Sequence, residues 1–415
     1  MTGTKGPELR RTLGLGDAVV IGLGSMVGAG IFAALAPAAH AAGTGLLLGL
    51  AVAAVVAYCN ATSSARLAAL YPASGGTYVY GRERLGDFWG YLAGWAFVVG
   101  KTASCAAMAL TVGAYVWPEQ AHAVAVAAVV LLTAVNYSGV QKSAWLTRAI
   151  VGVVLAVLAP VVVGCLTSAE ADAGRLGIGG PGGAGGVLQA GGLLFFAFAG
   201  YARIATLGEE VREPARTIPR AIPLALGITL SVYAAVAVAV LSVLGARELG
   251  DTAAPLADAV RAAGVPELAP VVRVGAVVAA LGSLLALILG VSRTTLAMAR
   301  DRHLPGALAA VHPRFRVPHR AELAVGAVVA VLAATVDVRG AIGFSSFGVL
   351  TYYAVANASA WTLDARPVTR VVPAVGLAGC LVLAFSLPWV SVAGGAGVLL
   401  AGVLVYGVRR SGGAR

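Results

Sequence analysis

Long apolar runs constrain this chain more than any other feature of its sequence. Most approach the length of about 20 residues at which an α-helix crosses the hydrocarbon of a bilayer. With 59% of its 415 residues apolar and only 11% charged, the chain lacks the polar surface that a water-soluble protein requires. We therefore predict an all-α membrane protein with twelve transmembrane helices. The runs occupy residues 17–40, 44–70, 87–117, 121–137, 143–168, 186–208, 219–245, 268–292, 322–336, 341–362, 369–387 and 389–408.

The lysines and arginines predict how these helices are oriented. If the N-terminus lies in the cytoplasm and the spans alternate, the cytoplasmic segments hold 22 of the 29 basic residues and the outside segments hold five. Basic residues favour cytoplasmic loops, and a span count wrong by one would destroy this bias. We expect a multi-pass protein of the inner (cytoplasmic) membrane that contacts lipid and has both termini in the cytoplasm.

Other classes of protein fit this sequence poorly. The net charge of +11 comes from basic residues scattered between apolar runs, which argues against nucleic acid as a partner. The five histidines lie at span ends or in loops, and neither HExxH nor GxSxG occurs, so we expect no enzyme and no catalytic residues. We also expect no cofactor and no metal site. The cysteines lack metal-ligand spacing and are predicted to be buried free thiols: Cys59, Cys105, Cys165 and Cys380.

The order of the spans predicts two halves within a single transmembrane domain that covers residues 1–415. The glycine-rich stretch 174–192 is expected to be an outside loop between two five-span blocks, 13–168 and 186–362. Such blocks are typical of transporters built from inverted repeats. Residues 363–415 would then carry two additional C-terminal helices.

The first run contains four glycines within nine residues, from Gly22 to Gly30. Each costs a helix interior about 1 kcal/mol relative to alanine, so the helix could break there. A break would expose amide N–H groups at the start of a half-helix, where the dipole favours a carboxylate. Two other interpretations remain: a small-residue packing face through Gly24 and Gly28, and a dinucleotide loop, which no accompanying strand supports.

The sixth run places aromatic residues around a second small-residue interruption, between Phe195 and Arg203. This pattern suits either a binding pocket or an aromatic packing stripe. Corresponding interruptions in the first span of each half indicate a binding site near the bilayer midplane. The pair therefore favours a pocket.

Several motifs, taken in order, resemble the amino acid–polyamine–organocation superfamily of transporters, and especially its small bacterial amino acid permeases. The resemblance covers nearly the whole chain. It is carried by Gly28-Ala29-Gly30-Ile31-Phe32, Tyr71-Pro72-Ala73-Ser74-Gly75-Gly76-Thr77-Tyr78, Glu209-Glu210-Val211-Arg212-Glu213-Pro214, Ile218-Pro219-Arg220-Ala221, Ala297-Met298-Ala299-Arg300-Asp301, Leu304-Pro305 and His312-Pro313.

The resemblance implies a leucine-transporter-like fold of five plus five helices, with the first and sixth helices unwound at the substrate. The amides of the first break would hold the carboxylate of an amino acid, and the carbonyls of the second would receive its ammonium group. Phe198 and Tyr201 would line or gate the side-chain pocket. The substrate-binding residues so implied are Ser25, Met26, Val27, Gly28, Ala29, Gly30, Phe196, Ala197, Phe198, Ala199, Gly200 and Tyr201.

The sequence departs from the family at its coupling site. Many relatives carry a lysine in span five, where this chain has Val154, although the expected neighbour Ser283 is retained. Two cations elsewhere, Lys101 and Arg203, are atypical. Lys101 either snorkels or bonds carbonyls at a helix end, and Arg203 either pairs with a nearby carboxylate (Glu209 or Glu210) or serves the site. We hypothesise that Lys101 or Arg203 replaces the missing ammonium, which leaves proton coupling open.

These features predict a secondary active transporter for an amino acid. Residues 20–35 and 195–208 contain no carboxylate that would neutralise a cationic side chain, which favours a neutral, apolar substrate. An exporter or exchanger of the same fold is the closest alternative. A sensor that binds without transporting would use the same site.

Overall fold

A computed structural model describes residues 13–71, 75–139, 144–177, 182–201, 204, 211–363 and 366–412. Within them the chain is almost wholly helical, and the only β pairing is an isolated bridge between Leu13 and Val211. The helices are α1 (Leu15–Met26), α2 (Ala29–Ala33), α3 (Leu35–Ala42), α4 (Leu46–Leu70), α5 (Thr77–Leu85), α6 (Asp87–Val116), α7 (Ala121–Tyr137), α8 (Ala144–Leu166), α9 (Gly183–Phe198), α11 (Pro214–Asp251), α12 (Pro255–Ala262), α13 (Leu268–Arg300), α14 (His319–Thr335), α15 (Val338–Trp361), α16 (Pro367–Ser386) and α17 (Trp389–Gly412).

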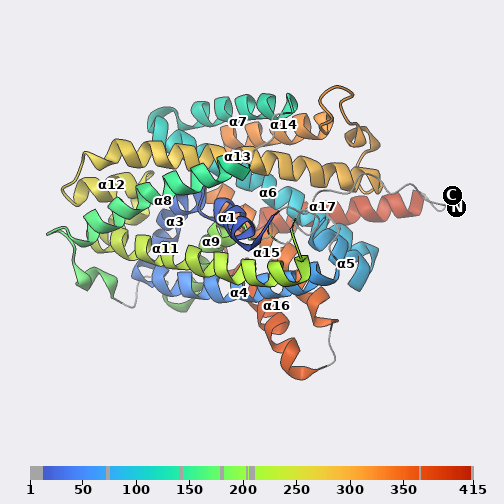
Figure 1. Cartoon of the computed structure of the whole chain (residues 1–415), viewed down its shortest axis with the longest axis horizontal. Coiled ribbons are helices and arrows are strands. Elements are labelled where there is room, and N and C mark those ends of the chain that lie inside the picture. Colours follow the sequence, from blue (N-terminus) through green and yellow to red (C-terminus); the bar gives the residue numbers. More distant parts are fainter. Residues whose placement is uncertain are drawn as a thin grey trace.

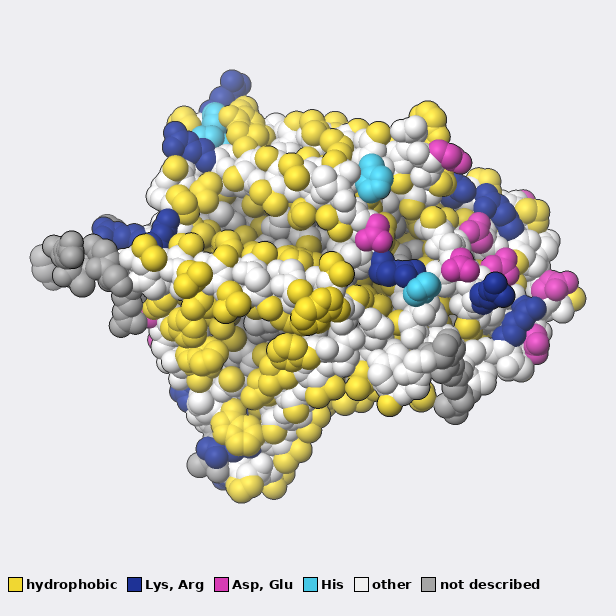
Figure 2. All heavy atoms as spheres, turned by 180° about the vertical axis from the view of Figure 1, so that it is seen from behind, with side chains coloured by type: hydrophobic (Ala, Val, Ile, Leu, Met, Phe, Trp, Pro, Cys, Tyr) yellow, Lys and Arg dark blue, Asp and Glu magenta, His cyan; other side chains and the backbone are white. Residues whose placement is uncertain are grey.

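Most of the long helices run roughly along the longest axis of the molecule (Figure 1). Hydrophobic side chains cover much of the middle of the face in Figure 2, and many of the charged ones lie toward its two ends. Nine helical segments of the described chain are long and apolar enough to cross a membrane. The chain is therefore a multi-pass membrane protein. The expected count of twelve stays a prediction, because α9, α14 and α15 are not among these nine segments.

Helix α6 lies at the centre of the packing. It is 30 residues long, and its buried face contacts α7, α13 and α15. Glycines allow some of these contacts to be close: a Cβ on Gly100 would lie 3.1 Å from the backbone nitrogen of Val349 in α15. The four cysteines are buried and free, as predicted.

The first predicted span is interrupted, as its glycines suggested. Helix α1 ends at Met26, and α2 begins at Ala29. Between them Gly28 has φ −129° and ψ −142°, which lies outside the helical region. Ala34 has helical angles and accepts from the Ala38 amide at 3.2 Å, so α2 and α3 together form one half-helix.

The glycine-rich loop is shorter than predicted. We expected it to extend to residue 192, but α9 already begins at Gly183. The glycines serve close packing against α4 instead: a Cβ on Gly49 would lie 3.0 Å from the backbone nitrogen of Gly191. Helices α5 and α12 were not predicted, because both are too short to register as apolar runs.

Candidate functional site

The break between α1 and α2 is in direct contact with the end of α9. A Cβ on Gly200 would lie 2.1 Å from the carbonyl oxygen of Ser25, and one on Gly30 would lie 2.7 Å from the Cα of Ala197. Both approaches involve backbone atoms, so only glycine fits at these two positions. The end of α9 is thus held against the break between α1 and α2. The hollow that a substrate would need between them stays a prediction.

The chemistry of the first break comes from its backbone. The first N–H groups of a helix have no partner inside the helix, and they carry the positive end of its dipole. Here those groups belong to the half-helix that begins at Ala29. The preceding amides are already engaged: Val27 donates to Leu23 O at 2.6 Å and Gly28 to Met26 O at 2.7 Å. The break therefore presents the amides that follow Gly28.

Tyr233 of α11 ties the two breaks together. Its hydroxyl lies 2.6 Å from the carbonyl oxygen of Met26 and 3.1 Å from that of Ala197, and its side chain is buried. A phenol has one proton to donate, so these two carbonyls share a single donor. Its ring also contacts Phe198, with centroids 5.2 Å apart. Tyr233 is the polar link between the halves of the site.

Lys101 of α6 reaches the second break. Its ammonium nitrogen lies 3.3 Å from the carbonyl oxygen of Ala199, which follows the last residue of α9, and the side chain is only 7% exposed. The hydroxyl of Tyr353 approaches the same oxygen at 3.4 Å. No carboxylate of the described chain forms an ion pair with Lys101. Of the two interpretations offered for this lysine, the structure supports carbonyl bonding at a helix end rather than snorkelling.

Aromatic side chains enclose the end of α9. The ring of Tyr353 in α15 lies 5.0 Å from that of Tyr201 and 5.8 Å from that of Phe195, measured between centroids. All three side chains are buried. In this conformation the aromatic side chains pack against one another, and Phe198 packs against Tyr233. The role of Phe198 and Tyr201 as the wall or gate of a pocket stays a prediction.

The glycines of α1 also form a packing face. A Cβ on Gly24 would lie 2.5 Å from the Thr147 side chain of α8, and one on Gly28 would lie 2.2 Å from the hydroxyl of Ser283 in α13. The packing interpretation and the break are therefore both correct, and they use the same residues. Ser283 borders the first break. Val154, at the position of the missing lysine, is fully buried.

The structure describes all twelve predicted substrate-binding residues, and ten of them are buried, with Ser25 and Gly200 half-buried. Arg203, Glu209 and Glu210 lie outside the described residues, so the proposed pairing of Arg203 is not tested. Tyr233 and Tyr353 were not predicted from the sequence to belong to the site. The signal available for both was a tyrosine inside an otherwise apolar span.

Two of the loop motifs meet at one end of the helix bundle. The hydroxyl of Tyr78 donates to Asp301 Oδ2 at 2.5 Å and lies 2.9 Å from His303 Nδ1. Arg82 donates to the same carboxylate oxygen at 3.1 Å. The ring of Tyr91 lies 5.3 Å from that of His303. These contacts join α5, α6 and the loop after α13.

Residues 17–408 match a family model described as amino acid permease. An uncharacterized transporter of Mycobacterium tuberculosis is 78% identical over 97% of this chain and 92% of its own length. The branched-chain amino acid permease BcaP of Bacillus subtilis is 25% identical over 96% of this chain and 93% of its own length. The human cationic amino acid transporter 4 is 29% identical over 83% of this chain and 58% of its own length.

Proposed function

Because the chain belongs to the amino acid permease family, we propose that it is a secondary active transporter that moves an amino acid across the cytoplasmic membrane by alternating access. The observation that carries this proposal is the direct contact between the break that follows α1 and the end of α9, one from each half of the chain. The chemistry is that of a non-enzymatic permease.

The amino acid would bind between the two breaks. Its carboxylate would face the amides that follow Gly28, at the positive end of the half-helix that begins at Ala29. Its ammonium group would face the carbonyls of residues 196–199, at the negative end of α9. Tyr233 and Lys101 hold two of these carbonyls in the present conformation, at Ala197 and Ala199. Both donors would have to yield when a substrate enters.

We propose that the whole architecture follows the inverted-repeat plan. Twelve spans would comprise two halves, 13–168 and 186–362, followed by two additional helices in 363–415. The pairing of α1–α2 with the end of α9 supports this plan, because equivalent helices of the two halves would then meet at the site. The excess of basic residues in alternate loops supports cytoplasmic termini.

The transported side chain is proposed to be neutral and apolar. The segments that form the two breaks contain no carboxylate, and the aromatic rings of Phe198 and Tyr201 suit an apolar group. The branched-chain permease of B. subtilis supports this choice. The human cationic transporter is related at similar identity, so side-chain class has to be measured.

Of the two cations proposed to replace the missing ammonium of span five, Lys101 is the one whose position the structure describes. Its contact with Ala199 puts a positive charge beside the second break, whereas Val154 offers none. Lys101→Ala and Arg203→Ala would be assayed in proteoliposomes. We expect Lys101→Ala to lower uptake and to change its dependence on pH. If both variants keep wild-type uptake and a wild-type pH response, neither residue replaces the missing ammonium. Proton coupling through Lys101 or Arg203 would be contradicted by the same result.

The function itself is tested in two steps. A thermal-shift screen of the purified protein over the common amino acids identifies the ligand, because a molecule that binds only the folded state raises its apparent stability. Radiolabelled uptake of that ligand into proteoliposomes then distinguishes transport from sensing. Binding without flux would favour a sensor. Flux that requires an amino acid on the opposite side would favour an exchanger.

A further inference from the structure

Buried polar atoms without hydrogen-bond partners are concentrated between α7 and α14, two helices that contain neither of the two breaks. Five of the eleven such side-chain atoms in the described part of the chain belong to four residues of α7 and α14. They are Thr133 Oγ1, Asn136 Oδ1, His319 Nδ1 and both carboxylate oxygens of Glu322. Native proteins rarely leave such atoms unsatisfied, since each costs free energy unless a ligand or ion engages it.

The packing of α7 against α14 brings these residues together. Thr133 and Asn136 lie three residues apart on one face of α7, and His319 and Glu322 lie three apart on one face of α14. A Cβ on Gly326, one turn beyond Glu322, would lie 2.6 Å from Thr133 Oγ1.

The other end of the cluster is fixed by Tyr137, which lies one turn beyond Thr133. Its ring centroid lies 6.2 Å from that of His319, and His319 precedes Glu322 by three residues in α14. Glu322 therefore enters the interface between the levels of Thr133 and Tyr137, where Asn136 also lies. Asn136 is anchored there, because its side-chain nitrogen donates to Leu285 O of α13 at 3.2 Å. Its oxygen is left free to face a ligand.

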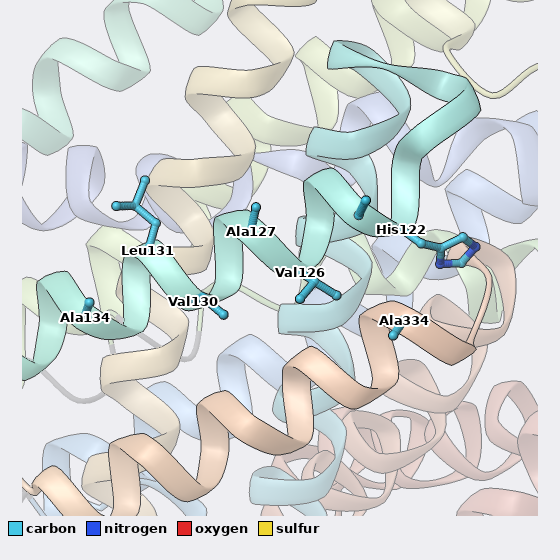
Figure 3. A pocket seen from close by; sticks show the side chains of 8 residues that line it. His122, Val126, Ala127, Val130, Leu131, Ala134 and Ala334 are labelled. Atoms are coloured by element: carbon cyan, nitrogen blue, oxygen red, sulfur yellow. The ribbon is translucent and has the colours of Figure 1, made fainter.

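The cluster lies beside an apolar groove of about 780 Å³ between the same two helices (Figure 3). His122 and Ala334 line the far end of that groove, and Ala134 lines the end next to Thr133. The groove is apolar and nothing in it suggests an occupant. The polar cluster beyond it is different, because it holds a carboxylate that is 0% exposed.

The charge on Glu322 lacks a matching partner. Arg293 of α13 is the charged group of the described chain that acts on it, but none of the ion pairs among the described residues joins the two. The titratable groups near it are His319 and, through the ring cluster with Tyr137, His312. Helix α6 and the segment Gly306–Ala309 also pack against α14, and neither adds a charged group that acts on this carboxylate.

We propose that this cluster is a binding site for one monovalent cation, either an alkali ion such as Na⁺ or a proton, whose charge neutralises Glu322. The ligand set consists of oxygens from Glu322, Asn136 and Thr133, which suits a hard cation. One carboxylate balances one positive charge. Neither Thr133 Oγ1 nor the carboxylate of Glu322 has a hydrogen-bond partner among the described residues, so both can take a ligand. The site lies apart from the paired breaks and does not depend on the proposed substrate.

Thermal unfolding of the full-length protein in detergent tests this site. Wild type would be compared in NaCl, KCl and choline chloride at equal ionic strength, from pH 5 to pH 8.5. If Na⁺ binds, we expect the wild-type Tm at pH 8.5 to rise with NaCl but not with choline. If a proton binds, we expect the Tm to fall as the pH rises, whichever salt is present. Either pattern supports the proposal.

Three variants make the result decisive. Glu322→Gln should lose the rise in Tm with Na⁺, or the fall in Tm with rising pH, that is seen in wild type, and Glu119→Gln, at an exposed glutamate just before α7, should keep it. Thr133→Val removes only a hydroxyl and replaces Glu322→Gln as the test variant if Glu322→Gln fails to fold. If Na⁺ is the occupant, Thr133→Val should weaken the apparent Na⁺ affinity about tenfold. If a proton is the occupant, it should leave the pH response intact. The proposal is wrong if wild type and Glu322→Gln respond alike to both Na⁺ and pH, or if wild type responds to neither.

Discussion

Removing the hydroxyl of Tyr233 is the most informative single change at the candidate site. Tyr233→Phe keeps the ring and its contact with Phe198 but leaves the carbonyls of Met26 and Ala197 without their shared donor. A hydrogen bond contributes about 0.5–1.5 kcal/mol net, and a buried acceptor left unsatisfied costs about 1–3 kcal/mol. Because one proton serves both carbonyls, we count a single bond and expect a loss of about 1–3 kcal/mol.

The measurement is the free energy of unfolding by SDS titration in mixed micelles, paired with substrate affinity. Because Tyr233 would have to yield when a substrate enters, a loss of about 1.4 kcal/mol confined to the unbound conformation would strengthen affinity about tenfold. Tyr80→Phe is the matched control, because the Tyr80 hydroxyl is buried without a hydrogen-bond partner among the described residues. It should leave both quantities unchanged or improve stability slightly. Equal effects of the two substitutions would refute the bridging role of Tyr233.

The remaining predictions use stability and uptake. Gly200→Ala should destabilise by about 1–3 kcal/mol, because its Cβ would meet the backbone of Ser25, whereas Gly16→Ala, with nothing within 4 Å, should not; chemical unfolding of both checks this. Lys101→Met should raise the free energy of unfolding, since a buried unpaired cation is removed, and it should lower uptake. A lower free energy of unfolding together with higher uptake would contradict the role proposed for Lys101. Burial lowers the pKa of His303, so the unfolded state takes up its proton first and stability should fall below about pH 6.5; His303→Gln should flatten that slope in pH-dependent melting.

Much of the architecture was predictable because the bilayer imposes a simple rule on composition. Each of the twelve apolar runs contains described helix, since twenty apolar residues have no other low-energy conformation in lipid. The break near Gly28 was equally accessible, because glycine weakens a helix locally. The start of α9 was misjudged for the same reason: glycine is also selected where two helices approach closely, as at Gly49 and Gly191.

The polar partners of the site could not be predicted in the same way. The packing of α11 and α6 against α9 decides which carbonyl Tyr233 or Lys101 reaches. The sequence alone does not specify how these helices are rotated about their axes. The cluster around Glu322 is a similar case. Four ordinary polar residues on two helices become notable only when packing removes them from water together. Long-range contacts, rather than local propensity, decide these features.

Hydrogen–deuterium exchange with and without the transported amino acid tests the central claim most directly. The account places the substrate carboxylate on the free amides that follow Gly28. Exchange should therefore slow in peptides that cover residues 25–32 and 196–201, while peptides from α16 and α17 stay unchanged. Protection elsewhere in the bundle, with none in these two segments, would contradict a binding site made by the paired helix breaks.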